Sequence, residues 1–192
     1  MTDSEHQHQH AHGYAEALEQ ARHEVEHYYR DHFDWRGHEP PAGWGGPRFY
    51  PPADKWRLDA WLDTSVAGTG DHVQLATSTG KLRDMTVAGQ LVFEVDGREH
   101  RLRVFWPHRH GDEEPTLFVA FQDGTSGGET YGAGRYLDLA PAGDDGIYDL
   151  DFNFAYSPSC AYSPKYDCPY PPPGNRLDIR VDAGEMVPFE EH

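Results

Sequence analysis

The sequence is poor in lysine, in cysteine and in long apolar runs. Its 192 residues include lysine only at Lys55, Lys81 and Lys165, and 16 basic residues stand against 33 acidic ones, a net charge of −17. Binding to nucleic acid or to an anionic membrane depends on neutralising phosphate with lysine and arginine, so this balance argues against both partners. An acidic, lysine-poor composition also keeps a protein soluble in high salt, which suggests a halophilic source.

No apolar run approaches the length of a membrane span, and the N-terminus lacks the basic and apolar regions of a signal peptide. A cytoplasmic location is therefore expected. The length is typical of one domain plus a tail, and it is sufficient for a real hydrophobic core. We expect a disordered tail over residues 1–13 and a single domain over 14–192.

Histidines occur in two places that invite a metal interpretation. His6 to His12 alternate with other residues in the tail, and His108 and His110 lie in the loop 106–115. The tail has no apolar anchor, and the loop lacks a third nearby ligand of fixed geometry. A disordered tail without a biological metal and an exposed hairpin end are the favoured interpretations, and opportunistic binding of nickel, copper or zinc by the tail is the alternative. No metal site is predicted.

Periodic patterns predict one helix followed by strands. Apolar residues recur at helical spacing over 14–33, which predicts an amphipathic helix. Between residues 56 and 182, short alternating segments predict about eight antiparallel strands, and Asp96-Gly97 predicts a two-residue hairpin. The expected fold is mainly β, a single antiparallel barrel or sandwich-like domain with the helix across it. The predicted strands are 56–62, 73–77, 87–95, 102–106, 117–121, 136–139, 150–156 and 177–181.

The segment from Asp149 to Arg176 holds both cysteines and six of the 15 prolines. Prolines fix φ and withhold backbone donors, so residues 157–176 are predicted to form a stiff loop after the strand. Cys160 and Cys168 match neither a zinc-finger nor a thioredoxin spacing. Reduced buried thiols, a disulfide that staples the loop, and half of a metal site are the three alternatives.

Three stretches, FNFAYSPSCAYSPKYDCPYPPPGNRL, FVAFQDGTSGGETYGAGRYLDL and VDAGE, resemble the family named domain of unknown function 1684. The resemblance extends to the helix and to FYPPADKWRL, and it implies a mostly β domain without an assigned activity. The family pattern has Asn at the position of Ser157 and Glu at that of Gly174. If either position contacts a ligand, the details differ in this chain.

Polar side chains gather in a glycine-rich loop, Gln122 to Arg135, and in the segment after residue 150. The loop matches neither a P-loop nor a dinucleotide fingerprint. Arg135 could clamp a carboxylate or phosphate, or it could pair with an acid and brace the loop. The candidate ligand-binding residues are Asp123, Glu129, Tyr131, Arg135, Asp151, Asn153 and Asn175.

These residues predict a pocket for a small polar or anionic ligand, formed by the loop 122–135 and the segment 151–176. One alternative is a hydrolase-like enzyme with Glu129 or Asp151 as its acid–base group. Another is a structural or protein-interaction module without a small-molecule site. The sequence identifies no cofactor.

Overall fold

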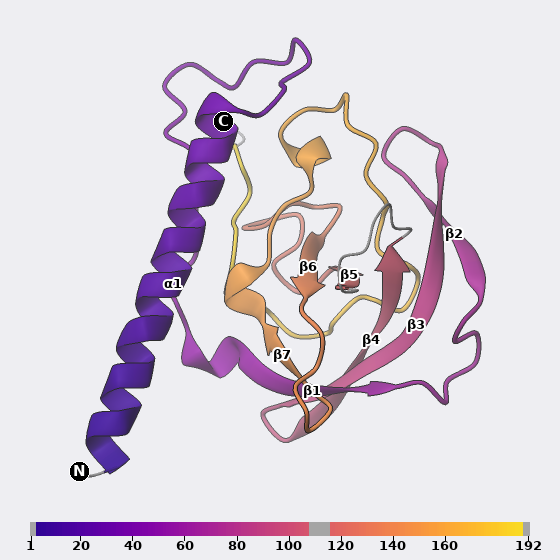
Figure 1. Cartoon of the computed structure of the whole chain (residues 1–192). Coiled ribbons are helices and arrows are strands. Elements are labelled where there is room, and N and C mark those ends of the chain that lie inside the picture. The colour runs from indigo at the N-terminus through magenta and orange to yellow at the C-terminus, as the bar shows by residue number, and fades with distance from the viewer. Residues whose placement is uncertain (1–2, 108–115, 190–192) are drawn as a thin grey trace.

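The computed structural model describes residues 3–107 and 116–189, and within the helix it describes side chains from Gly13 onward. One long helix lies beside a curled sheet (Figure 1), which confirms the predicted mainly β fold with an N-terminal helix. The elements are α1 (Asp3–Asp31), η1 (Asp54–Trp56), β1 (Arg57–Asp63), β2 (His72–Ala76), β3 (Leu82–Val95), β4 (Arg98–Pro107), β5 (Leu117–Phe121), β6 (Arg135–Leu139), β7 (Ile147–Asp151), η2 (Phe152–Phe154) and η3 (Ser159–Ala161), where η marks a 3-10 turn.

The strands form one antiparallel sheet. Their order is β6-β5-β4-β3-β1-β7, and β2 pairs with β3 off this path. Tyr136 of β6 also forms an antiparallel bridge with Tyr156, shortly after β7, so the two ends of the sheet curl toward each other. In the described part of the chain this is a half-barrel of seven strands, and neither an eighth strand nor a sandwich is confirmed.

The hairpin of β3 and β4 forms the centre of the sheet. Its turn is Asp96-Gly97, and both residues have positive φ, 51° and 72°, which confirms the predicted two-residue turn. β3 bends at a register shift between Val87 and Gly89. Gly89 has a φ of 146°, and a Cβ there would lie 2.6 Å from the carbonyl oxygen of Asp63 at the end of β1. The close approach of β1 to β3 at this bulge therefore requires glycine.

Two segments predicted as strands have another structure. Residues 150–156 leave the sheet after Asp151, because its side chain accepts a hydrogen bond from the backbone N–H of Asn153 (2.9 Å) and starts the turn η2. Residues 177–181 make only isolated backbone bonds to the glycine-rich loop, and the N–H of Val181 donates to the Asp123 carboxylate (2.9 Å) instead of to a ladder partner. Side-chain acceptors thus replace strand pairing in both places.

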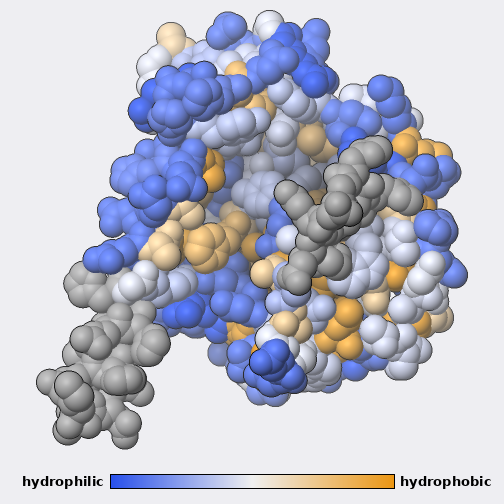
Figure 2. Space-filling view, in the orientation of Figure 1, coloured by the Kyte–Doolittle hydropathy of each residue, from blue (hydrophilic) through white to orange (hydrophobic). Residues whose placement is uncertain are grey.

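The helix α1 begins at Asp3 instead of Tyr14, so it includes most of the segment predicted as a disordered tail, and it ends at Asp31. That segment contains neither proline nor a glycine before Gly13, so nothing stops the helix from extending backward. Tyr29 of α1 stacks on Tyr162, with 3.7 Å between ring centroids. Apolar residues gather in the seam between α1 and the body, while hydrophilic ones cover most of this face (Figure 2).

The main hydrophobic core lies inside the curl of the sheet. It combines large side chains of the strands and of η2 with residues of the C-terminal segment, among them Phe93, Phe121, Phe152 and Val181. A smaller cluster contains both cysteines, and a third one joins α1 to Tyr162. In the described residues, no helix has the length and apolarity needed to cross a membrane.

Candidate functional site

Arg135 is the centre of a buried charge network. It is 1% exposed, and its partner Asp123 is 0% exposed, with 3.0 Å between Nη2 and Oδ2. The guanidinium also donates to three backbone carbonyls of the C-terminal segment, those of Val181 (2.9 Å), Ala183 and Glu185 (3.2 Å). Burial lowers the pKa of Arg135, and the Asp123 charge opposes this effect. Arg135 therefore fastens the C-terminal segment to β6.

The second oxygen of the Asp123 carboxylate is also fully occupied. Oδ1 accepts from the backbone N–H and the hydroxyl of Thr125 (2.9 and 2.6 Å) and from the hydroxyl of Ser126 (3.3 Å). A carboxylate with several donors on each side holds the glycine-rich loop in shape. The pairing matches the bracing alternative, in which Arg135 pairs with an acid of the loop.

Asp151 and Asn153 come together, but their partners belong to the protein itself. The Asn153 amide accepts from the N–H of Ala53 (2.9 Å) and donates to its carbonyl (3.0 Å), so it pairs with that residue as a strand would. Asp151 accepts from the hydroxyl of Tyr14 (2.7 Å), and Nε of Arg57 lies 3.7 Å from it. These contacts join the start of β1 and the helix α1 to the end of β7.

Asn175 lies elsewhere and fills a gap in the sheet. Its side-chain oxygen accepts from the N–H of Arg103 (2.8 Å), and its amide nitrogen donates to the carbonyls of Arg103 (2.8 Å) and Ala120 (2.9 Å). β4 and β5 share one register pair, Phe105 with Phe118. Asn175 satisfies backbone groups beyond that pair, where the two strands diverge.

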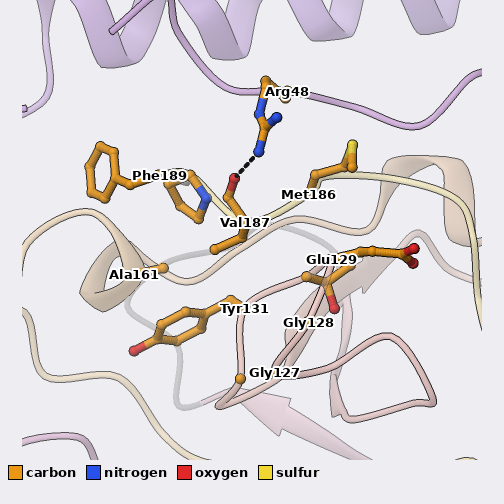
Figure 3. A pocket seen from close by; sticks show the side chains of 12 residues that line it. Arg48, Gly127, Gly128, Glu129, Tyr131, Ala161, Met186, Val187 and Phe189 are labelled. Carbon is orange, nitrogen blue, oxygen red and sulfur yellow. Dashed lines mark hydrogen bonds between the residues drawn. The ribbon is translucent and has the colours of Figure 1, made fainter. Parts of the chain in front are cut away.

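Glu129 and Tyr131 line a cavity of about 810 Å³ between the glycine-rich loop and the C-terminal segment (Figure 3). Its walls are Arg48, Gly127, Gly128, Glu129, Thr130, Tyr131, Gly132, Ala161, Met186, Val187, Pro188 and Phe189. A backbone hydrogen bond from Val187 to Glu129 (2.8 Å) ties the two walls together. Arg48 reaches the C-terminal segment as well, with Nη2 3.5 Å from the carbonyl oxygen of Val187 (Figure 3).

The environment of the Glu129 carboxylate does not suit a general acid. It accepts hydrogen bonds from the hydroxyl of Tyr50 (2.8 Å) and from Arg180, and these contacts lower its pKa. A general acid at neutral pH needs a raised pKa instead. Glu129 is thus an ionised group that is already paired.

One residue of this region was missed by the sequence reasoning. Glu185 is 0% exposed, and its Oε1 accepts from the hydroxyl of Tyr162 (2.5 Å). Its Oε2 and the nearby hydroxyl of Ser157 are buried without a hydrogen bond within the described residues. Burial raises the pKa of Glu185 to about 7, although the hydrogen bond from Tyr162 and the charge of Arg135 act in the opposite direction. Only the motif VDAGE marked this position, and a motif does not reveal burial.

The cysteines are free thiols, each 8% exposed, in the small apolar cluster beside β3 and β6. Among the described residues, no three His, Cys, Asp or Glu side chains are grouped as a metal site would require. His108 and His110 lie outside the described residues, as do the side chains of the histidines at 6–12. The predicted ligand-binding candidates thus lie in four separate places, the Arg135 network, the Asp151 network, the cavity with Glu129 and Tyr131, and the position of Asn175 between β4 and β5.

Comparison with known proteins adds a family and a fold. The model of the family "Protein of unknown function (DUF1684)" matches residues 43–186. The solution NMR structure of an uncharacterized protein from Haloarcula marismortui is 33% identical, with a TM-score of 0.70, and the alignment covers 95% of this chain and 99% of that one. No curated protein matches.

Proposed function

We propose that this chain, which belongs to the DUF1684 family, binds a small polar ligand in the cavity between the glycine-rich loop and residues 186–189. The observation that carries the proposal is the lining of that cavity. Gly127, Gly128 and Gly132 present bare backbone to it, and a main chain without side chains can approach a ligand closely. A volume of about 810 Å³ is within the range of small-molecule sites.

The polar groups of the cavity favour a ligand with hydroxyl or anionic groups. Arg48 contributes positive charge to the lining, and the Tyr131 ring contributes an aromatic surface and a hydroxyl (Figure 3). The negative charge of Glu129 is offset by Arg180, so the cavity does not repel an anion as the rest of this acidic protein does. Met186, Val187 and Phe189 add an apolar wall.

The site differs from the predicted one in its anchor. Arg135 is the expected anchor, but its guanidinium donates its hydrogen bonds to Asp123 and to the C-terminal carbonyls. Asp151 and Asn153 bond to each other and to neighbouring protein groups instead of lining the cavity. Of the segment 151–176, only Ala161 lines the cavity. These contacts also give no support to Glu129 or Asp151 as an acid–base group.

Two measurements test the proposal. Native mass spectrometry of the purified protein is expected to show a retained small molecule, and amide chemical shifts are expected to change at residues 127–132 and 186–189 when phosphates, carboxylates and sugars are added. Gly132→Leu places a side chain in the cavity and is expected to abolish these shift changes. The variant should still fold, because a Cβ at Gly132 meets its nearest neighbour at an ordinary 3.5 Å.

Gly13→Leu is the matched control, because a Cβ at Gly13 meets nothing within 4 Å and the residue lies outside the cavity. This variant is expected to keep both the retained molecule and the shift changes. Equal binding by Gly132→Leu and the parent protein would contradict a ligand site in this cavity. A full panel without any shift change, together with an empty mass spectrum, would do the same.

A further inference from the structure

Cys160 and Cys168 lie against each other at the two ends of a short loop. The backbone N–H of Cys160 donates to the sulfur of Cys168 (3.3 Å), and both thiols are free. The backbone of Cys168 is held by Ser78, which receives a hydrogen bond from its N–H (3.1 Å) and donates one to its carbonyl (2.9 Å). The two sulfurs are thus kept together by contacts outside the loop itself.

The surroundings make the two thiols unequal. The Cys168 thiol, Ser78 and the Tyr131 hydroxyl, whose oxygen lies 3.9 Å from the Cys160 sulfur, lower the pKa of Cys160 to about 7, although burial acts in the opposite direction. The hydrogen bond to Cys160 and burial raise the pKa of Cys168. Of the two, Cys160 is therefore the sulfur more readily ionised near neutral pH, and Cys168 is the one that favours the protonated thiol.

We propose that Cys160 and Cys168 are a peroxide-sensitive pair that closes reversibly to a disulfide across residues 160–168. The pair has the two parts that such chemistry needs, an activated sulfur on Cys160 and a second sulfur, on Cys168, that lies 3.3 Å from the Cys160 backbone nitrogen. Each cysteine is 8% exposed, and a hollow of about 320 Å³ is lined by Cys168 and by Ser159, the residue before Cys160. This access suits a small oxidant such as hydrogen peroxide better than a protein partner.

The reaction is balanced in two steps. The Cys160 thiolate attacks one oxygen of the peroxide, the O–O bond breaks, and hydroxide leaves and takes a proton to become water. The product is a sulfenic acid on Cys160. The Cys168 sulfur then loses its proton and attacks the Cys160 sulfur, the S–O bond breaks, and a second water leaves as the disulfide forms. The two thiols lose two electrons, and the peroxide gains them.

The experiment follows the mass of the intact protein after treatment with hydrogen peroxide, under conditions that oxidise free cysteine completely. The expected product is lighter by about 2 Da, has no free thiol, and regains both thiols in dithiothreitol. Unreacted thiols would overturn the proposal, and so would a product that gains oxygen atoms instead of losing two hydrogens. This test needs no variant, so a folding defect cannot obscure it.

Variants then assign the roles of the two sulfurs. Cys168→Ser is expected to accumulate oxygen on Cys160, because the resolving thiol is gone, whereas Cys160→Ser is expected to stay unmodified over the same time. Tyr131→Phe removes one donor to the thiolate. If this raises the Cys160 pKa by about one unit, the thiolate fraction at neutral pH and the rate fall about fivefold. Equal reactivity of the two single-serine variants would contradict the assignment.

Discussion

Replacing the buried Glu185 by glutamine is expected to make the protein more stable at neutral and alkaline pH. The carboxyl is fully buried, and only its Oε1 has a hydrogen-bond donor among the described residues, the hydroxyl of Tyr162. A charge at this position is poorly solvated, which is why the pKa is raised. Glutamine has the same shape, retains the oxygen that Tyr162 needs, and carries no charge.

The sign and size follow from proton linkage. In the unfolded chain the carboxyl has its ordinary pKa of 4.5, and in the folded protein the pKa is about 7. Between these two values the folded state holds a proton that the unfolded state has released, so the free energy of unfolding falls as the pH rises. About 1.4 kcal/mol per pH unit across this interval gives a loss of about 3 kcal/mol.

The assay is urea unfolding of the parent protein and Glu185→Gln at several pH values between about 4 and 8. We expect similar stabilities where the carboxyl is protonated in both states, and an advantage of about 3 kcal/mol for the glutamine variant above the folded pKa. Glu94→Gln, an exposed position on β3, makes the same chemical change without burial. The reasoning would be refuted if the free energy of unfolding of the parent protein and of Glu185→Gln had the same pH dependence. It would also be refuted if Glu94→Gln differed from the parent protein as much as Glu185→Gln does.

Three further results are expected. Arg135→Met leaves the buried Asp123 without its cation and should lower the free energy of unfolding by about 3–5 kcal/mol, whereas Arg180→Met, at an exposed pair, should barely move the urea midpoint. Gly89→Ala should destabilise clearly, since its Cβ would clash with the Asp63 carbonyl, and a fully stable variant would contradict that geometry. With a net charge of −17, the thermal midpoint should rise with potassium chloride over the molar range, and an unchanged midpoint would count against salt adaptation.

The sequence predicted those parts of the fold that depend on local patterns. The turn Asp96-Gly97 needs only two residues that tolerate positive φ, and the short apolar segments that become β5 and β6 are visible without knowledge of their partners. The prediction of a strand over 177–181 was wrong because the backbone N–H of Val181 donates to the carboxylate of Asp123, a residue far away in the chain. No periodicity contains that information.

The same limit explains the outcome for the candidate site. Arg135 and Asp123 were selected because charged residues next to glycines often serve ligands, and the alternative of an internal brace was equally compatible with the sequence. What distinguishes the two is the carbonyl set of Val181, Ala183 and Glu185, which reaches Arg135 only in the folded chain. Glu185 itself looks like an ordinary surface residue until its burial is known.

The cavity lies between Glu185 and Cys160. This arrangement connects the proposed ligand site with the titration of Glu185 and with the proposed oxidation of the cysteine pair. On one side, Met186 and Val187 line it directly after Glu185, whose backbone carbonyl is held by Arg135. On the other side, Tyr131 lines it while its hydroxyl donates to the Cys160 sulfur. One wall is therefore continuous with Glu185, whose pKa lies near neutral pH, and the other contacts Cys160, the sulfur of the proposed peroxide-sensitive pair. If either change alters the position of Tyr131 or of residues 186–187, we expect the affinity of a ligand in the cavity to depend on pH and on the oxidation of the cysteines.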